Sequence, residues 1–372
     1  MFKHSISLGR IFGIEVDLDS SWFLIFGLLT WILAVSYYPA EFRNWSAVQY
    51  WLMGAVTAAM LFVSVLLHEL GHSVVALRYG LPVPRITLFI FGGVSQISQE
   101  PANALSEFWI AIAGPLVSFL LAAIFGALQL VFVKMSPLLA LAKYLALLNF
   151  VLGSFNLAPG FPLDGGRIFR AILWGITRNL QRATTIAAVT GQAFGYLLIF
   201  GGVWQALSGN FFNGLWIAFI GWYLESAARS QLQMQTLKSV LAGHTVSEIM
   251  RRDLETVPAV TTIQELVDHH ILTAGKRCFI VEGDGGRAGM VTVSTLKEVP
   301  RSEWSSTSVG QVMIPPEKLI SIGPNAEVWA ALEEMGRDGV NQLPVVQDGG
   351  IVGLVSREDV LQYLTLWQVF GR

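Results

Sequence analysis

One short motif in the chain has the residue types and the spacing of a metal-dependent hydrolase. It reads His-Glu-Leu-Gly-His and runs from His68 to His72. Residues four apart share one face of a helix, so both imidazoles can reach the same metal ion. Glu69 follows the first histidine, where a carboxylate can accept the proton of an attacking water molecule. The setting is unusual, because residues 51–67 contain no charged residue.

Two histidines leave a catalytic zinc site one protein ligand short, because such sites usually have three. Asp164 is the best candidate, in the sequence Pro-Gly-Phe-Pro-Leu-Asp-Gly-Gly from Pro159 to Gly166. The prolines prevent a regular helix, and the glycines allow conformations that could turn Asp164 toward a metal. Unwound backbone at membrane depth must be buried or line a water-filled cavity. A solvated aspartate in a surface loop is the alternative, which the nearby histidine motif disfavours.

Four other acidic residues of this region have simpler explanations. Glu225 lies one helical turn before Arg229, which predicts an ion pair within one helix at the cytoplasmic edge of the membrane. Glu41, Glu100 and Glu107 fall in loops or at the ends of apolar runs, where we expect them to be solvated.

The composition indicates that most of the chain lies in a membrane. Hydrophobic residues make up 53% and charged residues 13%, whereas a soluble domain carries about 25% charged residues. Six stretches have the length and apolar character of a bilayer span, roughly 20–38, 48–78, 105–134, 137–157, 184–207 and 212–232. A net charge of −2 and the lack of a basic stripe argue against nucleic acid as a partner.

Basic residues predict the orientation in the membrane. Four arginines lie between the fourth and fifth spans, whereas the loops on the opposite side carry only Arg43 and Lys134. The positive-inside rule then places both termini in the cytoplasm, which agrees with an even number of spans. We expect a multi-pass protein of the cytoplasmic (inner) membrane of a prokaryote, with the lipid bilayer as its first partner.

Residues 84–97, between the second and third spans, predict a short β-hairpin. The segment is rich in β-branched and aromatic residues and is broken by Gly92 and Gly93. It is too short to span a bilayer. Either it dips into the membrane, with its backbone paired or lining a cavity, or it is an ordinary cytoplasmic hairpin.

The last third of the chain contains an internal repeat. Three pairs of short segments match at an offset of 63 to 65 residues: 246–250 with 309–313, 278–281 with 343–346, and 289–292 with 353–356. Each unit predicts strand, helix, strand, strand, helix, which favours two tandem domains. We expect a membrane domain over 1–235, a linker over 236–243, and two small α/β domains over 244–302 and 303–372.

The single cysteine, Cys278, lies in an apolar strand and is expected to be a buried structural thiol.

These motifs resemble the site-2 proteases, which are intramembrane zinc metalloproteases. The histidine motif, the segment from Asn156 to Gly165, Gly92-Gly93 and Ala113-Gly114-Pro115 carry the resemblance. It implies one catalytic Zn²⁺ held by His68, His72 and Asp164, with Glu69 as general base. It also implies that Asn156 helps to bind the substrate backbone. The hairpin at Gly92 and Gly93 would pair with the unwound substrate as an added strand.

The C-terminal repeat resembles a pair of cystathionine-β-synthase (CBS) domains, as one subgroup of the site-2 proteases has. The expected fold is therefore a polytopic α-helical membrane protein with a short membrane-associated hairpin, followed by an α/β CBS pair. Nucleotide-binding CBS domains carry Gly-x-x-Thr/Ser-x-x-Asp, which the second repeat keeps through Ser356 and Asp359. The first repeat has Thr295 in place of the aspartate. The resemblance thus implies an adenine nucleotide in at most one familiar ribose site, or a purely structural pair that forms a homodimer.

The sequence also departs from the family pattern in the third span. Some relatives have an asparagine two residues after Gly-Pro-Leu, where this chain has Ser118. Whether Ser118 makes the polar contact that the asparagine of those relatives makes is not determined by the sequence.

The function expected from these observations is endoproteolysis of a transmembrane segment of a membrane protein, for example a membrane-bound regulator such as an anti-sigma factor. The CBS pair would modulate cleavage through a nucleotide or through its conformation. The alternative is a CBS-gated channel or transporter with the histidines on a metal permeation path. That alternative gives no reason for a glutamate beside the first histidine.

Overall fold

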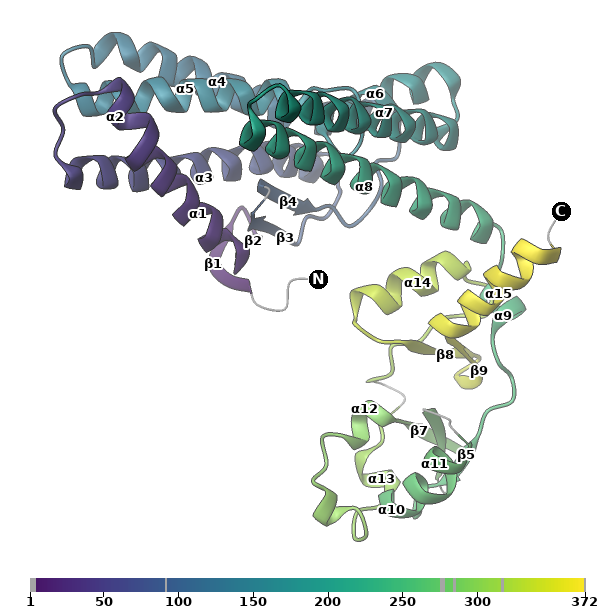
Figure 1. Cartoon of the computed structure of the whole chain (residues 1–372). Coiled ribbons are helices and arrows are strands. Elements are labelled where there is room, and N and C mark those ends of the chain that lie inside the picture. Colours follow the sequence, from purple (N-terminus) through teal and green to yellow (C-terminus); the bar gives the residue numbers. More distant parts are fainter. Residues whose placement is uncertain (1–4, 91, 275–277, 284–285, 316–317, 371–372) are drawn as a thin grey trace. The chain divides into compact units, whose positions relative to one another are not determined.

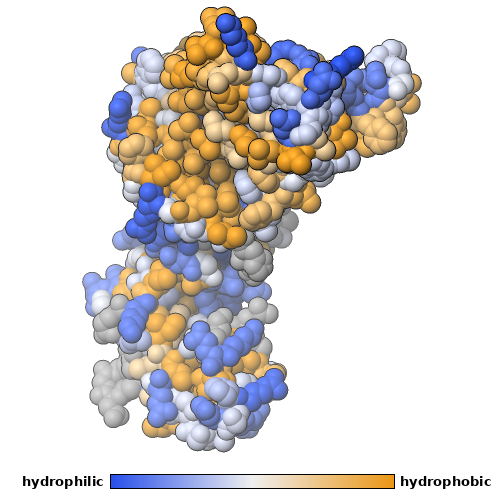
Figure 2. Space-filling view, turned by 90° about the vertical axis from the view of Figure 1, so that its left-hand side faces the viewer, coloured by the Kyte–Doolittle hydropathy of each residue, from blue (hydrophilic) through white to orange (hydrophobic). Residues whose placement is uncertain are grey.

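The structure is a computed structural model that describes residues 5–370, apart from 91, 275–277, 284–285 and 316–317. The chain divides into two compact units, Met1–Gln235 and Thr236–Arg372. Figure 1 shows long helices in the first unit and short helices with small sheets in the second. In the space-filling view, apolar side chains cover most of the visible face of the first unit, whereas the second has a mixed surface (Figure 2).

The first unit contains the helices long enough to cross a bilayer. Among the described residues, five helical segments meet both the length and the hydropathy of a span: Ser21–Glu41 (α1, the π-helical turn η1 and α2), Ala47–Arg78 (α3), Ala104–Val131 (α4), Ser136–Asn156 (α5) and Leu180–Leu207 (α7). The sixth predicted span, 212–232, is helical within α8 (Phe211–Leu241) but is not one of these five. Its polar residues include Glu225, which forms the predicted ion pair with Arg229 (Nη2–Oε1 2.6 Å).

Helix α3 carries the histidine motif near its C-terminal end. It begins with a capping box, in which Ser46 Oγ accepts from the backbone N–H of Gln49 and the Gln49 side chain accepts from the backbone N–H of Ser46. Its 32 residues span about 48 Å, which exceeds the apolar thickness of about 30 Å. The chain ends the helix at Arg78 and turns at Gly80, whose φ is +77°.

A four-stranded sheet packs beside α3 (Figure 1). Its order is β1 (Ser5–Ile11), β2 (Ile14–Asp19), β3 (Arg85–Phe89) and β4 (Gly92–Gln96), with β2 and β3 parallel and the other pairs antiparallel. The hairpin predicted within 84–97 is confirmed as β3–β4. The β1–β2 hairpin was not predicted. Its buried Ile14 packs with Ile86 of β3 and Leu70 of α3, so the second hairpin rests on the first and on the helix.

Helix α5 ends at Asn156, and α6 (Asp164–Thr177) begins at Asp164. The intervening segment is not helical, as the prolines predicted. Neither Gly165 nor Gly166 has a left-handed backbone, and both lie in the first turn of α6. A Cβ at Gly165 would lie 2.3 Å from the Leu157 carbonyl oxygen, and one at Gly166 would lie 2.3 Å from the Gly160 carbonyl carbon. Glycine is therefore needed for close packing against the loop, rather than for an unusual φ as we expected.

Each repeat of the second unit has its own hydrophobic core, and a smaller cluster of Ile280, Met290 and Ile351 joins the two repeats. The first contains β5 (Thr256–Pro258), a helical stretch α10–η2–α11 over 263–274, β6 (Cys278–Gly283), β7 (Gly286–Thr292) and α12 (Val293–Leu296). The second contains α14 (Val328–Arg337), β8 (Gln342–Gln347), β9 (Gly350–Ser356) and α15 (Arg357–Phe370). Its first predicted strand is reduced to one parallel bridge between Ile322 and Val345.

The two repeats exchange their first short helices. Val246 of α9 (Val246–Ile249) is buried in the second core, and Val309 of α13 (Val309–Val312) is buried in the first. Backbone bonds fix both exchanges, from Val246 N–H to the Ala326 carbonyl and from Val309 N–H to the Thr261 carbonyl. Each hydrophobic core therefore contains residues from both repeats.

Candidate metal centre

Three side-chain atoms meet between α3 and α6. His68 Nε2 lies 3.1 Å and His72 Nε2 lies 3.2 Å from Asp164 Oδ2, and the two nitrogens are 3.3 Å apart. His68 and His72 are 3% and 4% exposed. The helix spacing places the histidines one turn apart, and the non-helical segment before Asp164 returns the chain so that α6 starts beside them. The structure thus brings together the three residues that the sequence pointed to as metal ligands.

The outer ring nitrogens of both histidines have their own partners. His72 Nδ1 lies 2.7 Å from the Ile110 carbonyl oxygen, and His68 Nδ1 lies 2.8 Å from Ser118 Oγ. A carbonyl can only accept, so the proton of a neutral His72 is assigned to Nδ1 and its Nε2 carries a lone pair. Metal-bound histidines in proteins typically have such an outer contact, which fixes their tautomer and orientation. Ser118 therefore supplies a polar contact at the position where relatives have asparagine.

Gly114 of α4 forms one wall of the centre. A Cβ at this position would lie 2.1 Å from His72 Nε2 and 2.7 Å from His68 Nε2. Any other residue would occupy the space in front of the ligand atoms. Two imidazoles and one carboxylate are a donor set that zinc prefers, and their three ligand atoms lie within 4.8 Å of one another, so the described residues fit a zinc ion. The sequence marked Gly114 only as part of a family motif.

Strand β4 lies against the Glu69 carboxylate. Ser95 Oγ donates to Glu69 Oε2 at 2.6 Å. A Cβ at Gly93 would lie 2.5 Å from Glu69 Cγ, so this approach requires glycine. Gly93 and Ser95 are two apart and point to the same face of the strand. Ser95 was missed in the sequence, although its period-two spacing from Gly93 is a signal that could have identified it.

The remaining predicted substrate residues lie near these groups. The Asn156 side-chain nitrogen is 3.5 Å from His68 Nε2, at the end of α5. Gly92 opens β4 with a φ of +129° and pairs with Phe89. In the described part of the sheet, β4 is an edge strand with β3 as its only neighbour.

A buried ion pair anchors the helix that begins at Asp164. Arg170 of α6 donates through Nε to Glu107 Oε1 of α4 at 2.6 Å, and its guanidinium lies 5.2 Å from the Phe161 ring centroid. Glu107 is 0% exposed, so the expectation that it is solvated was wrong. The apolar end of α4 packs against α6, which excludes water from the carboxylate. This contact ties both α6 and the preceding loop to α4.

The predicted nucleotide residues lie in the second unit, where they form a helix cap. Asp359 Oδ2 accepts from the Ser356 backbone N–H at 2.9 Å and from Ser356 Oγ at 2.5 Å, and Asp359 Oδ1 accepts from Arg251 Nε. In the first repeat the Thr295 backbone N–H donates to Thr292 Oγ1 at 3.3 Å.

The single cysteine, Cys278, lies on β6. Burial raises the pKa of its thiol to about 12, which suits a structural rather than a reactive cysteine.

Two helix-borne histidines, a carboxylate from a second helix and an adjacent glutamate inside a unit of membrane-length helices define an intramembrane metallohydrolase. Comparison with known proteins agrees. The model of peptidase family M50 matches residues 56–143 and 132–199, and that of the CBS domain matches 246–301 and 309–366. The chain belongs to peptidase family M50, the site-2 proteases, and is a zinc metalloprotease and integral membrane protein with a C-terminal CBS pair.

Similar proteins extend over nearly the whole chain. Rip3 of Mycobacterium tuberculosis is 35% identical, in an alignment that covers 99% of this chain and 94% of Rip3. Protein sll0528 of Synechocystis is 33% identical and covers 97% of this chain and 96% of its own length. Both are named as zinc metalloproteases. The solved site-2 protease from Methanocaldococcus jannaschii is 32% identical and covers 62% of this chain and 95% of its own, with a TM-score of 0.43. The relatives favour the protease over the channel hypothesis.

Proposed function

We propose that this zinc metalloprotease hydrolyses a peptide bond in or near a transmembrane segment of a membrane-protein substrate. The observation that carries the proposal is the convergence of His68, His72 and Asp164 beside Glu69 under strand β4. A substrate strand beside β4 would lie next to both the base and the ligands.

In this proposal His68, His72 and Asp164 hold the zinc ion. The outer contacts to Ile110 and Ser118 hold each imidazole with Nε2 directed at Asp164 Oδ2. When bound, zinc acts as a Lewis acid that lowers the pKa of water to about 7 and polarises the scissile carbonyl.

Glu69 acts as the general base. Its carboxylate accepts the proton of the attacking water, whose oxygen forms the new bond to the carbonyl carbon. Glu69 then delivers that proton to the leaving nitrogen as the C–N bond breaks. The hydroxyl of Ser95 holds the carboxylate through Oε2, which leaves the other oxygen free for the proton transfers.

Strand β4 serves as the template for the substrate. A helical substrate hides its peptide bonds, so it must unwind before attack, and an edge strand can pair with the extended chain. Gly92 and Gly93 keep this edge free of side chains, and Asn156 offers an amide to the substrate backbone next to His68. The substrate class would be membrane-bound regulators such as anti-sigma factors.

The decisive test compares Glu69→Gln with the wild type in proteoliposomes that contain a panel of single-span membrane proteins. Loss of the base should reduce cleavage by about a hundred- to ten-thousandfold, while bound zinc, measured by mass spectrometry, stays unchanged. An active Glu69→Gln variant with normal zinc would contradict the mechanism. Comparing membrane proteomes of wild-type and Glu69→Gln strains would then identify the substrate.

We also propose that the CBS pair binds an adenine nucleotide and modulates cleavage, and that it mediates homodimerisation. To bind a ribose, the Asp359 carboxylate must give up its contact with Arg251 and accept hydrogen bonds from the ribose hydroxyls instead. Exposed Leu361 and Leu366 on α15 suit a dimer contact.

Calorimetric titration of the full chain with ATP, ADP and AMP tests the nucleotide. Asp359→Asn should abolish binding, and Asp348→Asn, at an exposed turn, is the matched control. Flat curves for all three nucleotides would reject the site. Light scattering of Leu361→Asp, which should be monomeric, tests the dimer.

The membrane orientation is a further part of the proposal. The distribution of basic residues supports cytoplasmic termini and a cytoplasmic CBS pair at the inner membrane of a prokaryote. Five spans would place the termini on opposite sides, so this orientation requires α8 to cross as well. Alkaline phosphatase fused after Arg372 should be inactive; an active fusion would contradict the orientation.

A further inference from the structure

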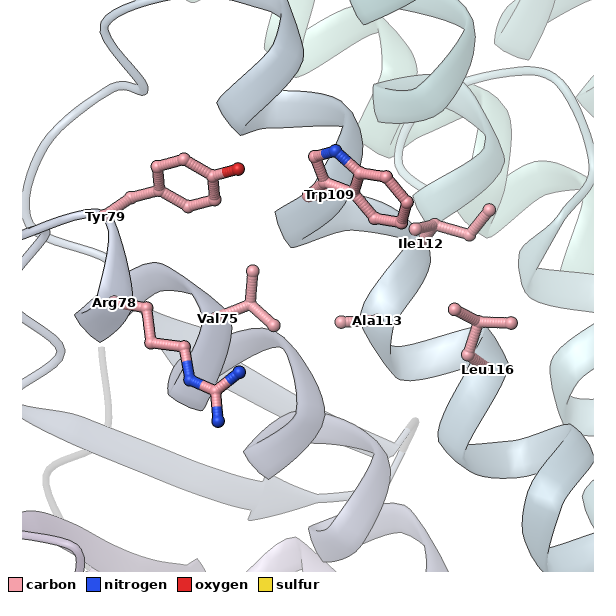
Figure 3. Close-up of a pocket in the computed structure, with 7 residues that line it drawn as sticks. All are labelled: Val75, Arg78, Tyr79, Trp109, Ile112, Ala113 and Leu116. Carbon is pink, nitrogen blue, oxygen red and sulfur yellow. The ribbon is translucent and has the colours of Figure 1, made fainter.

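A groove between the C-terminal end of α3 and the N-terminal half of α4 lies outside the metal centre. Its volume is about 360 Å³. It is lined by Val75 and Arg78 of α3, by Tyr79 directly after that helix, and by Trp109, Ile112, Ala113 and Leu116 of α4. Figure 3 shows the α3 residues opposite the α4 residues, with the Tyr79 hydroxyl pointing in the direction of Trp109. None of these side chains belongs to the site described above.

The groove has a polar end at the membrane surface and an apolar end deeper in the membrane, which matches the headgroup and the acyl chains of a lipid. Arg78 is the last residue of the apolar helix α3, and α4 begins at Ala104, so Arg78, Tyr79 and Trp109 lie at the same membrane face. Arginine, tyrosine and tryptophan are the residues that favour this interface. From Trp109 to Leu116 the wall descends about 10 Å into the apolar layer. Trp109 and Leu116 are 47% and 52% exposed, so an occupant would touch them.

The positive charge of Arg78 favours a lipid with an anionic headgroup. Arg78 forms no ion pair with any residue that the structure describes, and the described lining contains no acidic side chain. A guanidinium at this depth binds a phosphate through several N–H donors. The tyrosine hydroxyl and the indole N–H can add polar contacts at the same end.

The size of the groove favours a single lipid over a helix. A transmembrane helix of a partner would need a contact about 30 Å long, whereas the groove wall on α4 covers about two helical turns. A volume of a few hundred Å³ is instead typical of a small-molecule site.

We propose that this groove binds one anionic phospholipid, with its phosphate on Arg78 and an acyl chain along Ile112 and Leu116. Because the lining includes Val75 and Ala113, neighbours of the helix segments that hold His72 and Gly114, the lipid would brace the α3–α4 contact behind the metal centre. The proposal requires the chain to be a membrane protein but does not depend on its protease activity.

The test uses the full chain in nanodiscs of equal parts phosphatidylglycerol and phosphatidylcholine, followed by mild detergent extraction and native mass spectrometry. The wild type should retain one phosphatidylglycerol in preference to phosphatidylcholine. Arg78→Gln should lower this preference about fivefold. Arg182→Gln is the matched control, because Arg182 is an exposed arginine in the first turn of α7. Equal retention of the two lipids by the wild type, or an unchanged preference in Arg78→Gln, would overturn the proposal.

A second measurement locates the lipid and excludes a misfolded variant. Phosphatidylglycerol with a photoreactive acyl chain should label the peptide that contains Ile112 and Leu116, and Trp109→Ala should reduce that labelling while bound zinc stays at the wild-type level. Glycerol phosphate should not compete, because the acyl chain contributes to binding. Labelling spread evenly over the apolar helices, full competition by glycerol phosphate, or a protein cross-linked to the groove in native membranes would each reject a specific lipid site.

Discussion

Each of the two units contains an aspartate in the first turn of a helix, next to basic side chains. The two aspartates differ in the contacts of their carboxylate oxygens. Asp359 in the CBS unit accepts from Ser356 and Arg251, so each of its oxygens faces a donor. Asp164 in the membrane unit places Oδ2 near two imidazole nitrogens, and the His72 nitrogen carries a lone pair when that imidazole is neutral. Acceptors directed at one another are unfavourable unless a cation or proton lies between them.

A carboxylate whose two oxygens each accept from a protein donor, like that of Asp359, is stable without a bound ligand. A carboxylate oxygen that faces imidazole lone pairs, like Asp164 Oδ2, requires a cation or a proton. Helix position does not distinguish the two, because both aspartates lie in the first turn of a helix. Their exposure is no guide either, because the Asp164 side chain is 16% exposed and that of Asp359 is 5% exposed. The predictions below test this distinction, from the largest effect on the metal to the smallest.

Gly114→Ala should abolish zinc binding and cleavage. The added methyl group would lie 2.1 Å from His72 Nε2 and 2.7 Å from His68 Nε2, so it would displace both ligand nitrogens. Zinc content of the purified protein is the measurement. Gly126→Ala on the same helix is the control, since its Cβ would meet no atom within 4 Å, and it should bind zinc normally. Full zinc occupancy in Gly114→Ala would show that the three ligands do not share an ion.

Ser118→Ala should weaken zinc binding by about ten- to a hundredfold, because an outer contact of a metal-bound histidine orients the ring. Competition with a chelator of known affinity measures the change. Ser118→Thr keeps the hydroxyl and should retain most of the affinity. Equal affinities of Ser118→Ala and the wild type would mean that His68 is held by packing alone.

Ser95→Ala should lower kcat about tenfold, because a hydrogen bond to a charged carboxylate contributes roughly 1.5–3 kcal/mol and only part of that acts on the transition state. Bound zinc should not change, since Ser95 contacts Glu69 and not the ligands. Ser95→Thr should restore activity. A parallel loss of zinc would show that the strand supports the metal centre rather than the base.

Arg251→Met should leave zinc binding unchanged and lower the unfolding free energy of the CBS unit by about 1 kcal/mol, a modest cost because the arginine is half exposed. Urea unfolding followed by tryptophan fluorescence measures this effect. The neighbouring exposed Arg252→Met is the control and should be neutral. A change in zinc content would show that the two aspartates are not independent.

Much of the membrane unit could be predicted because its constraints are local. A bilayer span requires a long apolar run, so five of the six predicted spans appear as long apolar helices. The four-residue spacing of His68 and His72 defines a shared helix face wherever the helix packs. Pro159 and Pro162, only three residues apart, disfavour a regular helix wherever the segment packs. Asp164 followed from the same local reasoning, combined with the small number of acidic residues available.

Other features required the tertiary structure. Glu107 looked like a solvated residue at a helix end, and only the packing of α6 against α4 gives it Arg170 as a partner. Ser95 looked like an ordinary strand residue until β4 was seen beside Glu69. The β1–β2 hairpin depends on long-range pairing with β3. The exchange of α9 and α13 between the CBS cores depends on backbone contacts between residues 80 and 48 positions apart, Val246 with Ala326 and Val309 with Thr261, which local propensity does not encode.

The sequence by itself determined the chemistry of this protein: a membrane-embedded helix with two histidines and a glutamate, an aspartate after a proline-interrupted segment, and a CBS pair. Only the tertiary structure decided the environment of those groups. Gly114 clears the space in front of the ligands, Ser118 and the Ile110 carbonyl orient the rings, and β4 holds Glu69. The reason is physical: residue type and spacing fix which atoms a segment can offer, whereas distances between segments are set by packing.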